Sequence, residues 1–401
     1  MTSPTTRPAP SGLLIANLLA QLAFGLLAMT ICLPSMQEWG AIFNTGQAAV
    51  QLTFSGYVVA YGSLQLLYGP LSDRIGRKKI LLFGLAVAFL GSVLAALAPN
   101  LPLLVAARVL QGAGAAAGMV VGRAMVQDLF QGPERTRVMA YVGMAMGLCP
   151  PLATIIGGQL HVRLGWQANF VVMAVLAVVL FAAAWRGLPD HQKATTVQPH
   201  WLRAMLSSYA RLGRERAFIL YVALLSMTTA TFYAFLGGAP IVLGSYGVGP
   251  DGIGYYIMCV PGAYIVGNYL ASHMAHRTGE RLMMGIGQAC TLAGIGLVVV
   301  LALAGLNTPL AFSLPLMLVG IGHGLLVPPA LAGTVGLVPA LAGSAAAVAG
   351  LMQQMTGAVG GFAVGLFRHE GALNLGWLML GFALCGAFAQ WLLHRRLART
   401  H

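Results

Sequence analysis

Apolar stretches of about twenty residues recur along the whole chain, and this repetition limits the possible folds more than any other feature. A helix needs about 20 mostly apolar residues to cross the hydrocarbon core of a bilayer. Only 8% of the 401 residues carry a charge, which excludes an ordinary water-soluble protein. The pattern predicts an all-α membrane protein with twelve transmembrane helices, at about 12–33, 47–68, 80–98, 102–122, 138–158, 166–185, 218–243, 252–275, 282–304, 310–333, 340–367 and 373–393.

The positions of Lys and Arg predict how these spans are oriented, because basic loops stay on the cytoplasmic side of a membrane. With twelve spans, 19 of the 22 basic residues fall on the side of the chain ends, and Arg163 and Arg368 fall on the other side. We therefore expect cytoplasmic N- and C-termini and a multi-pass protein of the inner (plasma) membrane. The net charge of +13 follows from this topology and does not indicate nucleic-acid binding.

The longest polar stretch divides the spans into two sets of six. It predicts a cytoplasmic linker at 187–217 between two helical bundles at 12–186 and 218–393, with a disordered N-terminus at 1–11 and a basic cytoplasmic tail at 394–401. The two halves echo each other, since RIGRKKILLFG at Arg74 corresponds to RTGERLMMGIG at Arg277. A repeat whose copies share one orientation is typical of one large architecture of secondary transporters.

The segment GPLSDRIGRKK, which begins at Gly69, forms a short turn between the second and third predicted spans. Gly69 and Gly76 permit close approach and a tight turn. Asp73 can cap a helix or pair with an Arg, and Arg74 and Arg77 hold the turn at the membrane surface.

The fourth predicted span, LVAARVLQGAGAAAG, contains Arg108 at membrane depth. An Arg inside the bilayer is costly, so it is usually functional. Gln111 lies three residues further along, on the same helix face. The alternative is structural, with the Arg108 guanidinium bound by backbone carbonyls and Gln111.

The first segment resembles motif A of the major facilitator superfamily, and the second is similar to motif B of the drug:proton antiporters. Residues 51–79 and 122–170 together resemble the Bcr/CflA group, the bicyclomycin and chloramphenicol resistance branch of the twelve-helix drug:proton antiporters. The resemblance implies two six-helix bundles that rock around a central site and a chain that acts as a monomer. It also implies export of drug-like or small organic molecules in exchange for protons.

The resemblance also implies roles for particular residues. Arg77 and Asp128 would pair across neighbouring helices in a gating motif, and Asp73 would lie near a helix start in the second bundle. The fifth-span motif corresponds to Pro150, Gly157 and Gly158, although Ala153 and Thr154 replace the usual Gly-Pro pair.

One departure from the Bcr/CflA pattern concerns proton coupling. Thr30 stands where the group usually has a first-span Asp, and none of the nine acidic residues falls at the centre of a predicted span. The basic-type groups within spans are Arg108 and His323. We therefore expect an anionic, zwitterionic or neutral substrate, with His323 as the proton carrier, since imidazole changes charge near neutral pH. The alternatives are proton transfer by Asp73 or Asp128, and uncoupled transport.

Several polar side chains within the spans are candidates for lining a substrate pathway. They are Gln21, Tyr57 and Tyr61 in the first half and Tyr233, Asn268 and Gln353 in the second. Polar seams between helices would produce the same pattern. The sequence contains no Walker, GxSxG or HExxH motif, so an enzyme, a cofactor or a metal site is not expected. A rival hypothesis is a transporter of one metabolite, such as a nucleoside, a siderophore or an amino-acid derivative. A second rival is a sensor or scaffold that does not transport.

Overall fold

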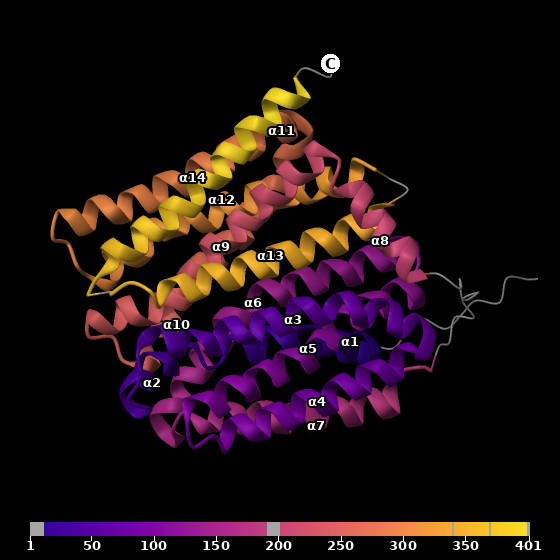
Figure 1. The fold of residues 1–401 in the computed structure, drawn as a ribbon, viewed down its shortest axis with the longest axis horizontal. Helices are drawn as coiled ribbons and strands as arrows, with labels where there is room; N and C mark the ends of the chain where they lie inside the picture. The colour runs from indigo at the N-terminus through magenta and orange to yellow at the C-terminus, as the bar shows by residue number, and fades with distance from the viewer. Residues whose placement is uncertain (1–11, 191–200, 339–340, 369, 399–401) are drawn as a thin grey trace, which may run out of the picture.

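The computed structural model describes residues 12–190, 201–338, 341–368 and 370–398, and the described residues form a helical protein (Figure 1). The predicted disordered N-terminus, part of the linker and the last three residues of the tail lie outside these ranges. The helices are α1 (Gly12–Thr30), η1 (Leu33–Ser35), α2 (Met36–Ile42), α3 (Gln47–Ile75), α4 (Arg77–Ala96), α5 (Leu101–Leu129), α6 (Gly132–Leu164), α7 (Gln167–Gly187), α8 (Trp201–Leu212), α9 (Arg216–Ser245), α10 (Pro250–Ile257), α11 (Cys259–Leu303), α12 (Pro309–Gly336), α13 (Ala342–Val364) and α14 (Ala372–Leu397).

Within the described ranges, nine helices are long and apolar enough to cross a membrane. The other three predicted spans coincide with α3, with α10 and the first part of α11, and with α13. These segments carry more glycine and polar side chains, and they supply contacts between the two halves of the molecule. A helix that faces protein on one side requires less apolar surface than one surrounded by lipid.

The helices differ from the predicted spans mainly at their ends. Several continue beyond the apolar stretch, as α5 does to Leu129 and α6 does to Leu164. Hydropathy marks the hydrocarbon layer, whereas backbone hydrogen bonding continues through polar residues at its edges. The continuous element α11 contains a turn at Gly279, whose φ of 72° separates two helices at the place where a loop was predicted. The linker contains a further short helix, α8, that was not predicted.

The first half (α1–α7) and the second half (α9–α14) lie one against the other in Figure 1, and α2 and α10 lie together at one end. We call this the closed end, because backbone segments of the two halves meet there. A Cβ atom on Gly365, after α13, would lie 2.5 Å from the Cα of Ala48 in α3. A Cβ atom on Gly158 of α6 would overlap the carbonyl oxygen of Pro250, the first residue of α10.

We call the opposite end the linker end, because α8 lies there (Figure 1). The turn between α3 and α4 is also at this end, and Lys78 donates a hydrogen bond of 2.9 Å to the carbonyl of Leu188, where the linker begins. Gly76 makes that turn with a φ of 115°, a conformation that strains any residue with a side chain. Gly76 therefore makes the tight turn that the sequence predicted at this position.

Candidate functional site

The Arg108 side chain lies in the centre of the first half and is fully buried. Its guanidinium donates to the carbonyls of Ala28 (2.8 Å), Met29 (3.3 Å) and Thr53 (3.4 Å). It also donates to the amide oxygen of Gln111. The C-terminal end of α1 and the first part of α3 thus converge on one cation, which matches the structural alternative for this residue.

The Arg108 cluster includes two further layers. Gln111 donates a 2.8 Å hydrogen bond to Ser92 of α4, and the Tyr57 ring stacks on the guanidinium at 4.3 Å from its centroid. Tyr57 in turn donates through its hydroxyl to the carbonyl of Gly25 at 2.7 Å. Backbone dipoles, an amide and an aromatic face together stabilise the charge without a carboxylate.

Other first-half candidates make contacts between or within helices. Gln21 donates to the carbonyl of Leu180 in α7 at 2.9 Å, and Thr30 donates to Leu26 of its own helix at 2.8 Å. Both side chains are fully buried. Tyr61 stacks on Tyr57, and its hydroxyl is without a hydrogen-bond partner among the described residues. The amide oxygen of Gln21 is likewise without a partner among the described residues, so both Gln21 and Tyr61 retain an unused polar group.

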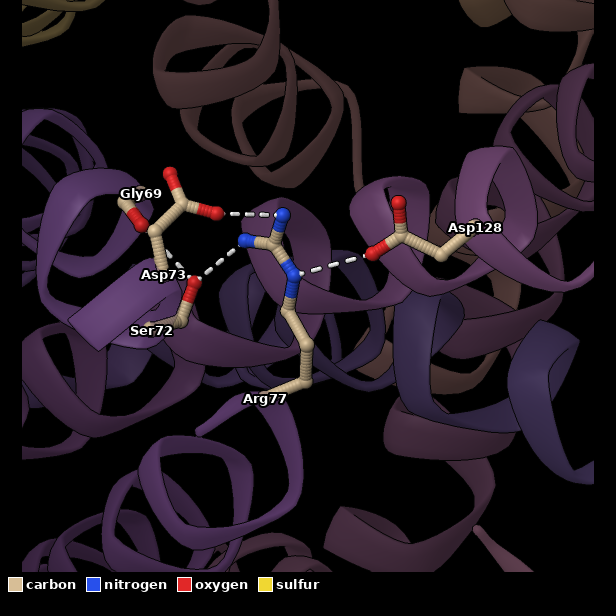
Figure 2. Close-up of polar contacts among 5 residues, drawn as sticks. All are labelled: Gly69, Ser72, Asp73, Arg77 and Asp128. Atoms are coloured by element: carbon tan, nitrogen blue, oxygen red, sulfur yellow. Dashed lines mark hydrogen bonds and ion pairs between the residues drawn. The ribbon is translucent and has the colours of Figure 1, made fainter. Parts of the chain in front are cut away.

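The gating motif forms a connected cluster at the linker end, as Figure 2 shows. Arg77 contacts Asp73 at 2.5 Å, Asp128 of α5 at 3.2 Å, and Ser72 at 2.6 Å. Ser72 also donates to the carbonyl of Gly69 at 2.8 Å. Arg74 lies in the last turn of α3 and Gly76 ends that helix. The expected Arg77–Asp128 pair is present, and Asp73 extends it; contact between Asp73 and a helix start in the second half stays a prediction.

The fifth-span residues lie where α6 meets its neighbours. Thr154 donates to the carbonyls of Pro150 (3.2 Å) and Pro151 (2.9 Å), one turn earlier in the same helix. Gly157 faces the backbone of Ile31, next to the end of α1, and Gly158 faces α10 of the second half. The lack of side chains at the two glycines therefore allows α6 to pack closely against the end of α1 in its own half and against α10 in the other half.

In the second half, the candidates divide between two places. Tyr233 of α9 donates to Gln354 of α13 at 2.8 Å, and Gln353 accepts from Thr229 at 3.3 Å. A Cβ atom on Gly62 of α3 would lie 2.5 Å from the Gln354 side chain, so this group borders the first half. It is a polar cluster between the halves, about midway along α3. Nearer the closed end, Gln51 and Ser55 of α3 also donate across the halves, to the carbonyls of Gly237 and Ala358, both at 2.9 Å.

His323 and Asn268 occupy a second place, where α12 packs on α11. His323 is 5% exposed, and its Nε2 is without a hydrogen-bond partner in the part of the chain that the structure describes. A Cβ atom on the adjacent Gly324 would lie 2.6 Å from the backbone nitrogen of Asn268. The structure does not bring His323 into the cluster formed by Tyr233 and Gln354.

A further polar cluster at the closed end was not predicted. His161 of α6 contacts Ser35 through Nδ1 and Glu38 through Nε2, both at 2.9 Å. Asn169 of α7 donates to the same Ser35 hydroxyl at 3.1 Å. Glu38 and His161 are 123 residues apart, so no local pattern in the sequence could have paired them. Among the described residues, no group of three or more His, Cys, Asp and Glu side chains could hold a metal ion.

Comparison with known proteins agrees with this architecture. Residues 13–361 match the Major Facilitator Superfamily. The chain is 27% identical to "Multidrug resistance protein D" of Escherichia coli, with 91% of this chain and 92% of that protein covered. It is 29% identical to a "Chloramphenicol resistance protein" of Pseudomonas aeruginosa, with 77% and 74% covered.

A solved structure, the peptide transporter POT, superposes with a TM-score of 0.78 at 15% identity, covering 97% of this chain and 96% of that one, which shows the shared fold. Relatives with resistance functions confirm the Bcr/CflA resemblance. The chain is therefore a multi-pass inner-membrane transport protein, not an enzyme, and it belongs to the Major Facilitator Superfamily.

Proposed function

We propose that this protein exports drug-like or other small organic molecules in exchange for protons, by alternating access between its two halves. The observation that carries the proposal is the junction at the closed end. There the halves touch through backbone at Gly158 and Gly365, and Gln51 of α3 adds a 2.9 Å hydrogen bond to the carbonyl of Gly237 in α9. Such a junction can separate and close again as rigid bodies. Relatives named for multidrug and chloramphenicol resistance support an exported drug as the cargo.

The proposal includes the topology. Twelve spans arise when α3, α10 with the first part of α11, and α13 are added to the nine apolar helices. The first bundle is 12–186, the linker 187–217 and the second bundle 218–393. The linker end faces the cytoplasm, together with both termini and the tail 394–401, because the basic residues gather on that side. The transporter acts as a monomer.

The substrate site in this proposal is the uncharged cluster between the halves. Tyr61, Tyr233, Gln353 and Gln354 offer hydroxyl and amide groups, with the Tyr61 hydroxyl unused. Such groups favour a neutral or zwitterionic molecule over a cation. Arg108 contacts the Tyr57 ring and so positions the first-half side of this cluster. His323, in the second half, is the proton carrier.

The test is uptake of radiolabelled chloramphenicol into proteoliposomes with an imposed pH gradient. We expect uptake that requires the gradient and is abolished by a protonophore. Tyr233→Phe, which removes the hydrogen bond to Gln354, should raise the apparent KM about fivefold. Ile219→Ala, at a lipid-facing position in the same helix, is the matched control and should leave KM unchanged.

A second candidate function is a carrier for one neutral metabolite without proton coupling. The absence of a carboxylate at the centre of any predicted span favours it. Nucleoside uptake that ignores the pH gradient, with no chloramphenicol uptake, would select this alternative.

A further inference from the structure

We infer, on the basis of the function proposed above, that Arg123 of α5 recognises an anionic group of the cargo and that the cargo is a small organic molecule with a carboxylate. The uncharged cluster between the halves binds the neutral end of this molecule. Arg123 binds its charged end, on the side of the cluster that faces the linker end.

Arg123 lies inside a helix and not in a loop. It directly follows the predicted span 102–122, and α5 continues for six more residues to Leu129, which corresponds to about 9 Å along the helix axis. Basic residues that only orient a membrane protein need to lie no deeper than its surface loops. A guanidinium at the edge of the hydrocarbon layer is costly unless it meets water or an anion, so its surroundings decide its role.

The Arg123 guanidinium has no ion-pair partner in the part of the chain that the structure describes. It donates a 3.3 Å hydrogen bond to the thioether sulfur of Met146 in α6, which is an uncharged and weak acceptor. Asp128, further along α5, contacts Arg77 instead. Most N–H groups of Arg123 are therefore available to a carboxylate, which guanidinium binds through two parallel hydrogen bonds.

The contact with Met146 places the Arg123 side chain beside the boundary between the halves. Gly147, the next residue of α6, faces α11 of the second half, and a Cβ atom on it would lie 3.2 Å from the Ile265 side chain. Arg123 is exposed, so the contact with Met146 leaves room for a ligand. A ligand held there lies between the two halves, as the cargo of an alternating-access transporter must.

The packing of α1 relates Arg123 to Tyr61. A Cβ atom on Gly122, next to Arg123, would lie 2.7 Å from the Leu22 side chain, and one on Gly25 would lie 2.7 Å from the Tyr61 ring. Leu22 and Gly25 are three residues apart, or about 4.5 Å along α1. Arg123 and Tyr61 also interact electrostatically. One small molecule can therefore reach both side chains.

The buried hydroxyl of Tyr61 provides an uncharged group for the other end of the ligand. Tyr61 is 2% exposed, and its hydroxyl is without a hydrogen-bond partner among the described residues. A buried hydroxyl without a partner is costly, and a polar atom of the ligand would remove this cost. A molecule with a polar group at one end and a carboxylate at the other satisfies both Tyr61 and Arg123, whereas the guanidinium repels a cation.

The experiment compares two ligands that share one scaffold and differ by a carboxylate. Chloramphenicol is neutral, and chloramphenicol succinate carries a carboxylate on the same molecule. Isothermal titration calorimetry measures the binding of each to the purified full-length chain at pH 7, in nanodiscs of zwitterionic lipid without a pH gradient. We expect the succinate to bind about tenfold more tightly, as one charge-assisted interaction would provide.

Two variants of Arg123 and one control test the residue. Arg123→Gln keeps a hydrogen-bonding side chain without charge and should reduce the ratio of the two affinities to about one. Arg123→Lys keeps the charge but loses the paired geometry, so a preference of about threefold should remain. Arg186→Gln removes the same charge from the exposed end of α7 and should leave the preference unchanged. Thermal unfolding confirms that each variant is folded.

A parent chain without the preference, including one that binds neither compound, overturns the inference. A preference that persists in Arg123→Gln also overturns it. Export of both compounds is measured separately in proteoliposomes. Succinate that binds tightly but is not exported would contradict the proposed function and leave the role of Arg123 intact. Export of chloramphenicol by a chain that shows no preference for the succinate would support the proposed function and contradict the role of Arg123.

Discussion

Arg108 in the first half and His323 in the second are both buried nitrogen bases within long helices, α5 and α12, yet their hydrogen bonding differs sharply. Arg108 donates to three carbonyls and an amide oxygen. His323 has a ring nitrogen without a partner among the residues described. A permanent charge in a membrane must be matched on all sides, whereas a neutral imidazole survives with an unused nitrogen. The first arrangement joins α1, α3, α4 and α5 around one cation, and the second leaves a buried ring nitrogen without a partner among the described residues.

The strongest test of this contrast is Arg108→Met. It removes the donor shared by Ala28, Met29 and Thr53 and leaves their carbonyls and the Gln111 amide without that partner. We expect a loss of about 3–5 kcal/mol in the free energy of unfolding. Thermal unfolding in detergent measures it. A variant as stable as the parent would show that Arg108 is not structural.

The converse change, His323→Arg, places a permanent charge where the structure offers an unpartnered nitrogen. Without partners such as those of Arg108, the guanidinium should cost about 3 kcal/mol. His323→Gln, which is uncharged, is the control for shape in the same unfolding assay. If both variants unfold at the parent's temperature, the surroundings of His323 accommodate charge and the contrast is wrong.

A smaller effect is expected from Ser92→Ala, which removes the acceptor of Gln111 while leaving the guanidinium contacts in place. The loss should be about 1 kcal/mol, because one buried donor loses its partner. Combining Ser92→Ala with Gln111→Leu in a double-mutant cycle isolates this hydrogen bond. Strictly additive effects of the two changes would argue against the connected cluster.

The smallest change in stability is expected for His323→Leu, under about 1 kcal/mol, because the unpartnered nitrogen is simply removed. Its effect should instead fall on coupling. Purified parent protein should release protons when chloramphenicol binds, and the variant should bind without release. Release that continues in the variant would assign the proton to Asp73 or Asp128.

The same contrast explains which parts of the site could be predicted from sequence. The gating turn was recognisable because Gly69, Asp73 and Arg77 lie within nine residues, and its partner Asp128 follows from the family pattern. For Arg108, the sequence predicted only the kind of partner, namely backbone carbonyls and Gln111. It could not identify the carbonyls, because no sequence motif marks those of α1 and α3 as neighbours of Arg108. The Glu38–His161 pair was missed altogether, because its residues come from helices far apart in the chain.

The sequence by itself determined the class of protein, the positions of the nine apolar helices among the described residues and the superfamily, and it supports the twelve-span count and the orientation that we propose. Hydropathy, basic loops and short motifs carry this information, and each is local along the chain. Only the tertiary structure decided that Arg108 is enclosed, that His323 lies apart from the cluster between the halves, and that glycines let backbones meet at the closed end. These features depend on which helix faces which, and that is settled by packing across the whole membrane domain.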